Sequence, residues 1–308
     1  SVLGVSMPAS ILAADGSSGA SPPPISFAPE VSDDDCRKRL SAELAPSAAP
    51  YEEYYRCKID FARLEHELPL SQDDLKKITF NPNNLKALTQ EQADQIYARL
   101  KAGSIPEGEY KIEVFRRPGG APFEDFLKLA GEKGNGLALL LSQTTLENFE
   151  KVWQGKVFTK SREMHNQGIV RTRIGDPRSL PEKLLKLLLS KVGDMKNLPL
   201  DKPLFPAKVY CGQSLLDGRR EAIIIDYAFS HQIPGYVKQI DWLMGPSGLQ
   251  VRDEIRMVRP GFYLGRVYMG RIFVLNMILY NEDLAKQDIP PTGQDCWGGT
   301  QQVAVGPK

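Results

Sequence analysis

The sequence lacks the short motifs by which several large enzyme classes are recognised. It contains no glycine-rich phosphate loop, no Gly-x-Ser-x-Gly elbow and no His-Glu-x-x-His pair. Its three histidines, His66, His165 and His231, lie in unrelated segments, and its four cysteines form no Cys-x-x-Cys pair. These absences disfavour P-loop, serine-hydrolase, zinc and covalent-haem chemistry, and they leave any cofactor unknown.

The chain also lacks a charge excess of one sign and a long apolar run. Its 308 residues carry 39 basic and 38 acidic side chains, a net charge of +1. Nucleic-acid binding needs a concentrated basic surface, so we expect no nucleic-acid partner. No run approaches the roughly 18 apolar residues of a membrane-spanning helix, so we expect no transmembrane span. With 42% hydrophobic residues, the composition is that of a globular protein.

Two features of the sequence bear on the compartment. Residues 2–14 are largely apolar and close with Ala13 and Ala14, as the last part of a targeting peptide does. No Asn-x-Ser/Thr acceptor occurs, which fits a bacterial or plastid origin better than eukaryotic secretion. We therefore expect export or an organelle lumen, in the periplasm or a thylakoid or plastid compartment. The alternative is an Ala- and Ser-rich terminus with no targeting role.

Composition and periodicity divide the chain into four parts. Residues 15–31 are rich in Gly, Ser and Pro, and residues 1–31 together are predicted to form a flexible N-terminal segment, a possible remnant of a targeting peptide. Residues 32–102 predict a helical lobe, and residues 103–282 an antiparallel barrel with inserted helices. Residues 283–308 predict an irregular C-terminal tail.

The helical lobe is predicted from a periodic apolar pattern and two N-terminal signals. Apolar residues recur every three or four positions between Tyr54 and Leu68. Ser32 precedes three aspartates, as an N-cap does, and Thr89 to Gln92 has the pattern of a capping box. Cys36 and Cys57 can form a disulfide within this lobe, or all four cysteines can be unrelated thiols.

From Gly103 the apolar period changes from helical to alternating. Residues 109–116 alternate and predict a strand with one buried face. Asp217-Gly218 is the pattern of a two-residue type I′ hairpin turn, and Gly270 lets the chain fold back; such short connections imply antiparallel pairing. Further predicted strands are 151–158, 168–174, 206–210, 222–229, 249–258, 261–269 and 271–280, with a helix at 181–189.

The segment 261–280 is largely apolar on both faces. One face of its first strand carries Phe262, Leu264, Arg266 and Tyr268, and the other carries Tyr263, Gly265, Val267 and Met269. A helix covers the outer face of such a strand, while the inner face lines a core or cavity, as in a closed or partly closed barrel.

Short segments spread over residues 103–280 resemble a group of lipocalin-like, or calycin-like, proteins. The matching segments are Gly103–Gly108, Trp153–Phe158, Pro206–Tyr210, Leu216–Gly218, Ile225–Tyr227, Val251–Arg256 and Gly261–Tyr268. The resemblance implies an α+β fold in which an antiparallel lipocalin-like β-barrel follows the helical lobe. It also implies an apolar ligand such as a lipid, a pigment or haem. The lipocalin Gly-x-Trp signature is absent as such, because here Trp153 precedes Gly155.

Six residues are the candidate ligand contacts. Arginine recognises carboxylate or phosphate through a rigid fork of donors, and inward tyrosines can orient a polar head. The polar candidates are Arg256, Tyr263, Arg266 and Tyr268, and the apolar lining candidates are Trp153 and Met257. The alternative is a cross-strand ion pair at Arg256, tyrosines at the barrel rim and a Trp153 that closes one end by packing.

We therefore expect non-enzymatic binding of an apolar or amphipathic small molecule, a lipid or pigment, in a barrel cavity. One alternative is an accessory or assembly subunit of a larger membrane-associated complex, which its extended terminal segments would contact. Another is a barrel enzyme that uses Asp226 or Asp253 as general acid or base. For Asp226, an outward-facing strand carboxylate is the competing interpretation.

Overall fold

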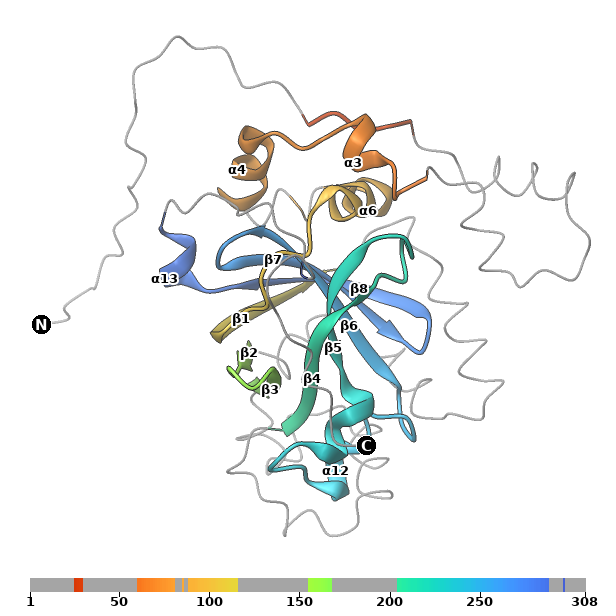
Figure 1. Ribbon diagram of the computed structural model, residues 1–308, viewed down its shortest axis with the longest axis vertical. Coiled ribbons are helices and arrows are strands. Elements are labelled where there is room, and N and C mark those ends of the chain that lie inside the picture. Colours follow the sequence, from red (N-terminus) through yellow and green to blue (C-terminus); the bar gives the residue numbers. More distant parts are fainter. Residues whose placement is uncertain are drawn as a thin grey trace, which may run out of the picture.

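A closed antiparallel β-barrel with helices packed against its outer side makes up the described part of the chain (Figure 1). The computed structural model describes residues 25–29, 60–80, 85, 88–115, 155–167, 204–287 and 296. The barrel strands are β1 (Gly108–Phe115), β2 (Gly155–Phe158), β3 (Glu163–Gln167), β4 (Leu204–Gln213), β5 (Glu221–Asp226), β6 (Val251–Arg259), β7 (Phe262–Met269) and β8 (Ile272–Tyr280). The other elements are α3 (Leu64–Glu67), α4 (Gln72–Phe80), α6 (Gln90–Arg99), the 3-10 helix η2 (Tyr227–Gln232), α12 (Lys238–Asp241) and α13 (Glu282–Ala285).

Each strand pairs with its neighbour in sequence, and β8 pairs back with β1 to close the barrel. Up-and-down barrels such as the lipocalins share this arrangement. The prediction of an antiparallel barrel is confirmed, although the strand Glu163–Gln167 was missed. The predicted strand 222–229 was too long, because the Asp226 side chain accepts a hydrogen bond from the backbone N–H of Ala228 (2.8 Å) and starts η2. The predicted strand 168–174 and helix 181–189 lie outside the described residues.

The two turn predictions had different outcomes. Between β7 and β8 the chain turns at Gly270, whose φ of 62° lies in the left-handed region, so this turn is confirmed. The type I′ turn at Asp217-Gly218 was wrong, because β4 ends at Gln213 and β5 begins only at Glu221. The Asp217 carboxylate instead accepts two hydrogen bonds from Arg256 (2.7 and 3.1 Å).

Strands β6 to β8 are buried on both faces, which for β7 was predicted from the apolar segment 261–280. Their inward side chains belong to a core cluster inside the barrel, which includes Ile255, Met257, Tyr263, Leu275, Met277 and Leu279. Their outward side chains pack with the helices in a second cluster, which includes Val258, Phe262, Leu264 and Ile278 together with Leu64, Ile96 and Tyr97. The outer cluster therefore fixes α3 and α6 against the wall of the barrel.

Helix α6 lies between the sheet and residues 25–29. Its N-terminus has the predicted capping box: the Thr89 side chain accepts from the Gln92 N–H (3.1 Å), and the Gln92 side chain accepts from the Thr89 N–H (3.1 Å). The Gln95 side chain exchanges two hydrogen bonds with the backbone of Ala28. Figure 1 shows α3, α4 and α6 together on one side of the barrel and α12 at its far end. Residues 32–59 of the predicted helical lobe lie outside the described residues.

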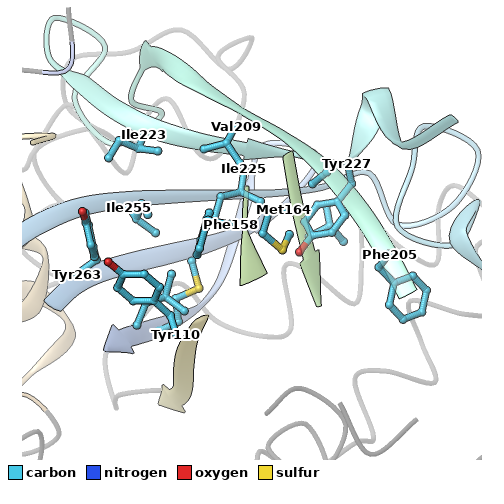
Figure 2. Packing of buried hydrophobic residues seen from close by; sticks show 14 of the residues in the cluster. Tyr110, Phe158, Met164, Phe205, Val209, Ile223, Ile225, Tyr227, Ile255 and Tyr263 are labelled. Atoms are coloured by element: carbon cyan, nitrogen blue, oxygen red, sulfur yellow. The ribbon is translucent and has the colours of Figure 1, made fainter. Parts of the chain in front are cut away.

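Side chains fill the middle of the barrel. Ile223, Ile225 and Ile255 are 0% exposed. Figure 2 shows them between Tyr110 and Tyr263 at one end of the core cluster and Tyr227 and Phe205 at the other. An added Cβ at Gly265 would lie 2.7 Å from Met277 Cε and 2.9 Å from Ile255 Cγ2, so the absence of a side chain there lets neighbouring strands pack closely.

We predict that Gly265→Ala lowers the free energy of unfolding by about 1–3 kcal/mol, because the methyl group overpacks the barrel interior. Chemical denaturation followed by circular dichroism measures the change. Gly218→Ala is the matched control, since the nearest atom to its Cβ would be Ser214 O at 3.9 Å. Equal stability of Gly265→Ala and the unchanged chain would show that this layer of the barrel is not tightly packed.

Candidate functional site

The predicted contact Arg256 lies on the outer face of the sheet, beneath α6. Its guanidinium forms a two-pronged ion pair with Asp217 and donates to the backbone oxygens of Glu221 (2.8 Å) and Tyr97 (3.0 Å). It also stacks over the Tyr97 ring, 4.6 Å from the centroid. All of these partners belong to the chain, so this arginine fastens α6 and the β4–β5 connection to the barrel.

Arg266 and Tyr268 share that outer face. Arg266 forms an ion pair with Asp94 of α6, donates to the Tyr268 hydroxyl (2.9 Å) and lies over the Phe273 ring at 4.0 Å. Asp94 in turn accepts from Gln90 (2.6 Å). Four polar side chains, two from α6 and two from β7, thus satisfy one another between the helix and the barrel.

The other candidates lie elsewhere. Tyr263 and Met257 face the barrel interior, and the Tyr263 hydroxyl donates to the backbone oxygen of Ser104 (2.8 Å). Trp153 lies outside the described residues. The structure therefore divides the candidates between the two faces of one sheet, and Arg256 and Arg266 do not meet Tyr263 around one interior space.

A different group of polar side chains lies inside the barrel. Lys156 Nζ donates to Asn166 Oδ1 (2.9 Å) and to the Tyr227 hydroxyl (2.8 Å), and it lies 3.0 Å from Asp253 Oδ2. Asn166 Nδ2 donates to the backbone oxygen of Phe205 (3.0 Å) and to the Tyr227 hydroxyl (3.2 Å). All four side chains are buried, with Lys156 only 2% exposed. We call these four residues the interior polar cluster.

The cluster joins opposite walls of the barrel. Lys156 comes from β2 and Asp253 from β6, which are four strands apart in a closed ring of eight. Both have the inward register, since their cross-strand partners include Tyr110 for Lys156 and Val267 for Asp253. Tyr227 is the first residue of the β5–β6 connection, so the cluster lies beside that end of the barrel.

Electrostatics fix the charge state of the cluster. Burial alone lowers the pKa of the Lys156 ammonium, but Asp253 and Tyr227 outweigh burial and raise this pKa to about 12. Burial, together with the Asp253 charge, raises the pKa of Tyr227 to about 12. At neutral pH the lysine is therefore a cation and the tyrosine a neutral phenol. The cluster is thus a set of hydrogen-bonding groups, not a source of a free amine nucleophile or a phenolate base.

Comparisons with protein-family models, with curated proteins and with solved structures give no match to this chain. Within the described residues, no helix is long and apolar enough to cross a membrane. In the same part of the chain, no group of three or more His, Cys, Asp and Glu side chains is placed to hold a metal ion. The functional argument therefore depends on the geometry of this molecule.

Sequence reasoning missed Lys156, Asn166 and Tyr227 as site residues. The sequence does contain one indication, a lysine between apolar neighbours in the strand 155–158. Without the strand register, however, the sequence does not show whether Lys156 faces inward or outward. Asp253 was predicted as a candidate catalytic carboxylate and not as a ligand contact. The other such carboxylate, Asp226, lies on the outer face and accepts from the Tyr210 hydroxyl (2.6 Å).

We predict that Lys156→Met lowers the free energy of unfolding by about 3–5 kcal/mol, because Asp253 is left buried without its counter-ion. Adding Asp253→Leu to this variant recovers much of the loss, since both charges are then removed. Lys160→Met, an exposed lysine in the same hairpin, is the control and changes stability little. A double substitution as unstable as the single one would contradict the ion pair as the cause.

The same pair gives a prediction for alkaline pH. The folded pKa of Lys156, about 12, lies above the ordinary value of 10.5, so its stabilisation is fully present below about pH 10.5 and is lost as pH approaches 12. Stability curves measured by denaturation from pH 9 to 12 will therefore fall less steeply for Lys156→Met. Parallel stability curves for the variant and the unchanged chain would contradict a raised pKa of Lys156 in the folded state.

Proposed function

We propose that this chain binds an apolar or amphipathic small molecule of the lipid or pigment type inside its barrel. The observation that carries the proposal is the interior polar cluster: four polar side chains from four separate elements converge within an otherwise apolar interior. Binding sites for small molecules are typically apolar enclosures with a few convergent polar groups that fix the ligand's orientation. A barrel of eight strands is large enough to hold one small ligand.

Room for a ligand requires side chains that can move. The core cluster inside the barrel contains Met164, Met257 and Met277, whose unbranched side chains adapt to a changed neighbourhood at low cost. Val267 points inward next to Asp253, yet it is only partly buried. These features support entry of a ligand beside Asp253, with the methionines rearranging around it.

Native mass spectrometry of the protein from its source tests the proposal, followed by solvent extraction and absorption spectroscopy. We expect one lipid or pigment molecule per chain. Recovery as an assembly with other protein subunits and without a small molecule would contradict the proposal and favour an accessory role in a complex.

We predict that Val267→Phe weakens binding of the neutral fluorescent probe N-phenyl-1-naphthylamine by about tenfold or more, because the larger ring fills the space beside Asp253. Fluorescence titration measures the affinity. Val157→Phe is a matched control: Val157 is also a partly buried strand valine, but it lies between the inward residues Lys156 and Phe158 and faces outward. Equal weakening by both substitutions would contradict an interior site.

We also propose that the chain works in an oxidising compartment, as an exported or organelle-lumen protein. A disulfide joins Cys211 of β4 to Cys296, and such bonds persist mainly outside reducing compartments. This pairing was not predicted, and Cys36 and Cys57 lie outside the described residues. The bond brings a residue of the C-terminal region into the core cluster of the barrel.

We predict that alkylation of the source protein under denaturing conditions without reductant leaves Cys211 and Cys296 unmodified. Peptide mass spectrometry will then find the two cysteines in one linked peptide pair, which separates after reduction. Full alkylation of both without reductant would contradict the oxidising compartment.

A further inference from the structure

We infer that the interior polar cluster selects ligands that carry a hydrogen-bond donor, above all an uncharged hydroxyl group, over carboxylates and over groups that only accept. This inference rests on the proposed binding function and specifies the chemistry of its ligand. It follows from a count of donors and acceptors in the cluster.

The donors of the cluster are already used. The Lys156 ammonium has three N–H bonds, and its three neighbours are Asn166 Oδ1, the Tyr227 hydroxyl and Asp253 Oδ2, at 2.9, 2.8 and 3.0 Å. The two N–H bonds of Asn166 reach the Phe205 backbone oxygen and the Tyr227 hydroxyl. The Tyr227 hydroxyl donates its proton to Asp253 Oδ2 (3.4 Å). A ligand carboxylate would have to displace one of these contacts.

The cluster retains one group that can still accept a hydrogen bond, an oxygen of the Asp253 carboxylate. Both contacts of the Asp253 carboxylate go to Oδ2, and its Oδ1 has no hydrogen-bond partner among the residues that the structure describes. The Asp253 side chain is 4% exposed, and Oδ1 is not one of the fully buried polar atoms without a partner in the described residues, so this oxygen keeps a small contact with solvent. A donor group of a ligand can therefore reach Oδ1, and a hydrogen bond to a carboxylate in this largely apolar enclosure is stronger than one in water.

The charges of the cluster also favour a ligand hydroxyl group over a ligand carboxylate. Lys156 already neutralises Asp253, so the cluster has no net positive charge with which to attract a carboxylate. A carboxylate would also meet the negative charge of Asp253 in an apolar enclosure, where such repulsion is poorly screened. A hydroxyl group donates to Oδ1 without adding charge. The predicted ligand class is therefore an apolar molecule with an alcohol group.

The test uses the full chain and displacement of N-phenyl-1-naphthylamine by three small molecules. These are 1-decanol, its isomer 1-methoxynonane, which accepts but does not donate, and decanoate. An apolar interior alone would favour the ether, because water solvates the alcohol better. We expect 1-decanol to bind about tenfold more tightly than either of the other two.

Asp253→Asn identifies the group responsible. The asparagine oxygen can still accept from Lys156, while its NH2 group then stands where Oδ1 stood, so the preference for 1-decanol over 1-methoxynonane is lost or reversed. Asp226→Asn is the matched control on the outer face and keeps the preference. If Asp253→Asn does not fold, as judged by circular dichroism, the comparison of the two isomers on the unchanged chain decides alone.

The outcomes separate the inference from the proposed function. Binding of all three molecules with equal affinity, or strongest binding of the ether or of decanoate, would overturn the inference and leave the binding function standing. Failure of the probe and of all three molecules to bind would overturn both. Preference for 1-decanol that Asp253→Asn removes and Asp226→Asn retains would support both.

Discussion

The contact between Lys156 and Asp253 crosses the inside of the barrel and constrains everything around it. The two residues come from β2 and β6, on opposite walls, and their charged groups lie 3.0 Å apart. Because each charge is buried, neither can relax towards water, and Asn166 and Tyr227 must occupy the remaining directions around the ammonium. The cluster around this pair therefore ties the positions of β2, β3, η2 and β6 to one another, and it places one polar layer in an otherwise apolar interior.

A second set of buried charges serves a different purpose on the other face of the sheet. Arg256 with Asp217 and Arg266 with Asp94 bind the β4–β5 connection and α6 to the outside of the barrel. Breaking one such pair is costly because the partner remains buried and charged. Strand β6 thus takes part in one buried polar network on each face, through Asp253 inside and Arg256 outside. Alternation along a strand separates the two networks: Asp253 points inward, and its neighbours Arg252 and Glu254 point outward, where they pair with each other (3.0 Å).

Local patterns predicted much of the fold. The capping box at Thr89, the alternating strand at residues 109–116 and the two apolar faces of residues 261–280 depend on near neighbours, and the structure confirms them. The interior polar cluster could not be predicted from the sequence, because its members come from four distant segments and meet only when the barrel closes. A shift of one residue in register would exchange inward and outward sides, so parity alone could not place Lys156 or Arg266. Asp217 was predicted to form a turn because only its neighbour Gly218 was visible as a signal. Its partner Arg256 lies 39 positions away in the sequence.

Stability alone does not account for the interior cluster. Buried ion pairs replaced by well-packed apolar side chains of similar size often leave stability unchanged or raise it. An all-apolar interior of the kind that Ile223 and Ile255 already form would serve the fold equally well. Lys156 and Asp253 add a means of orienting a ligand. The donors of the cluster are all used, and one carboxylate oxygen, Oδ1, can still accept a hydrogen bond. An apolar interior can only distinguish ligands by shape and size, whereas an oriented acceptor within it also distinguishes them by chemistry, which is the property that a binding site needs.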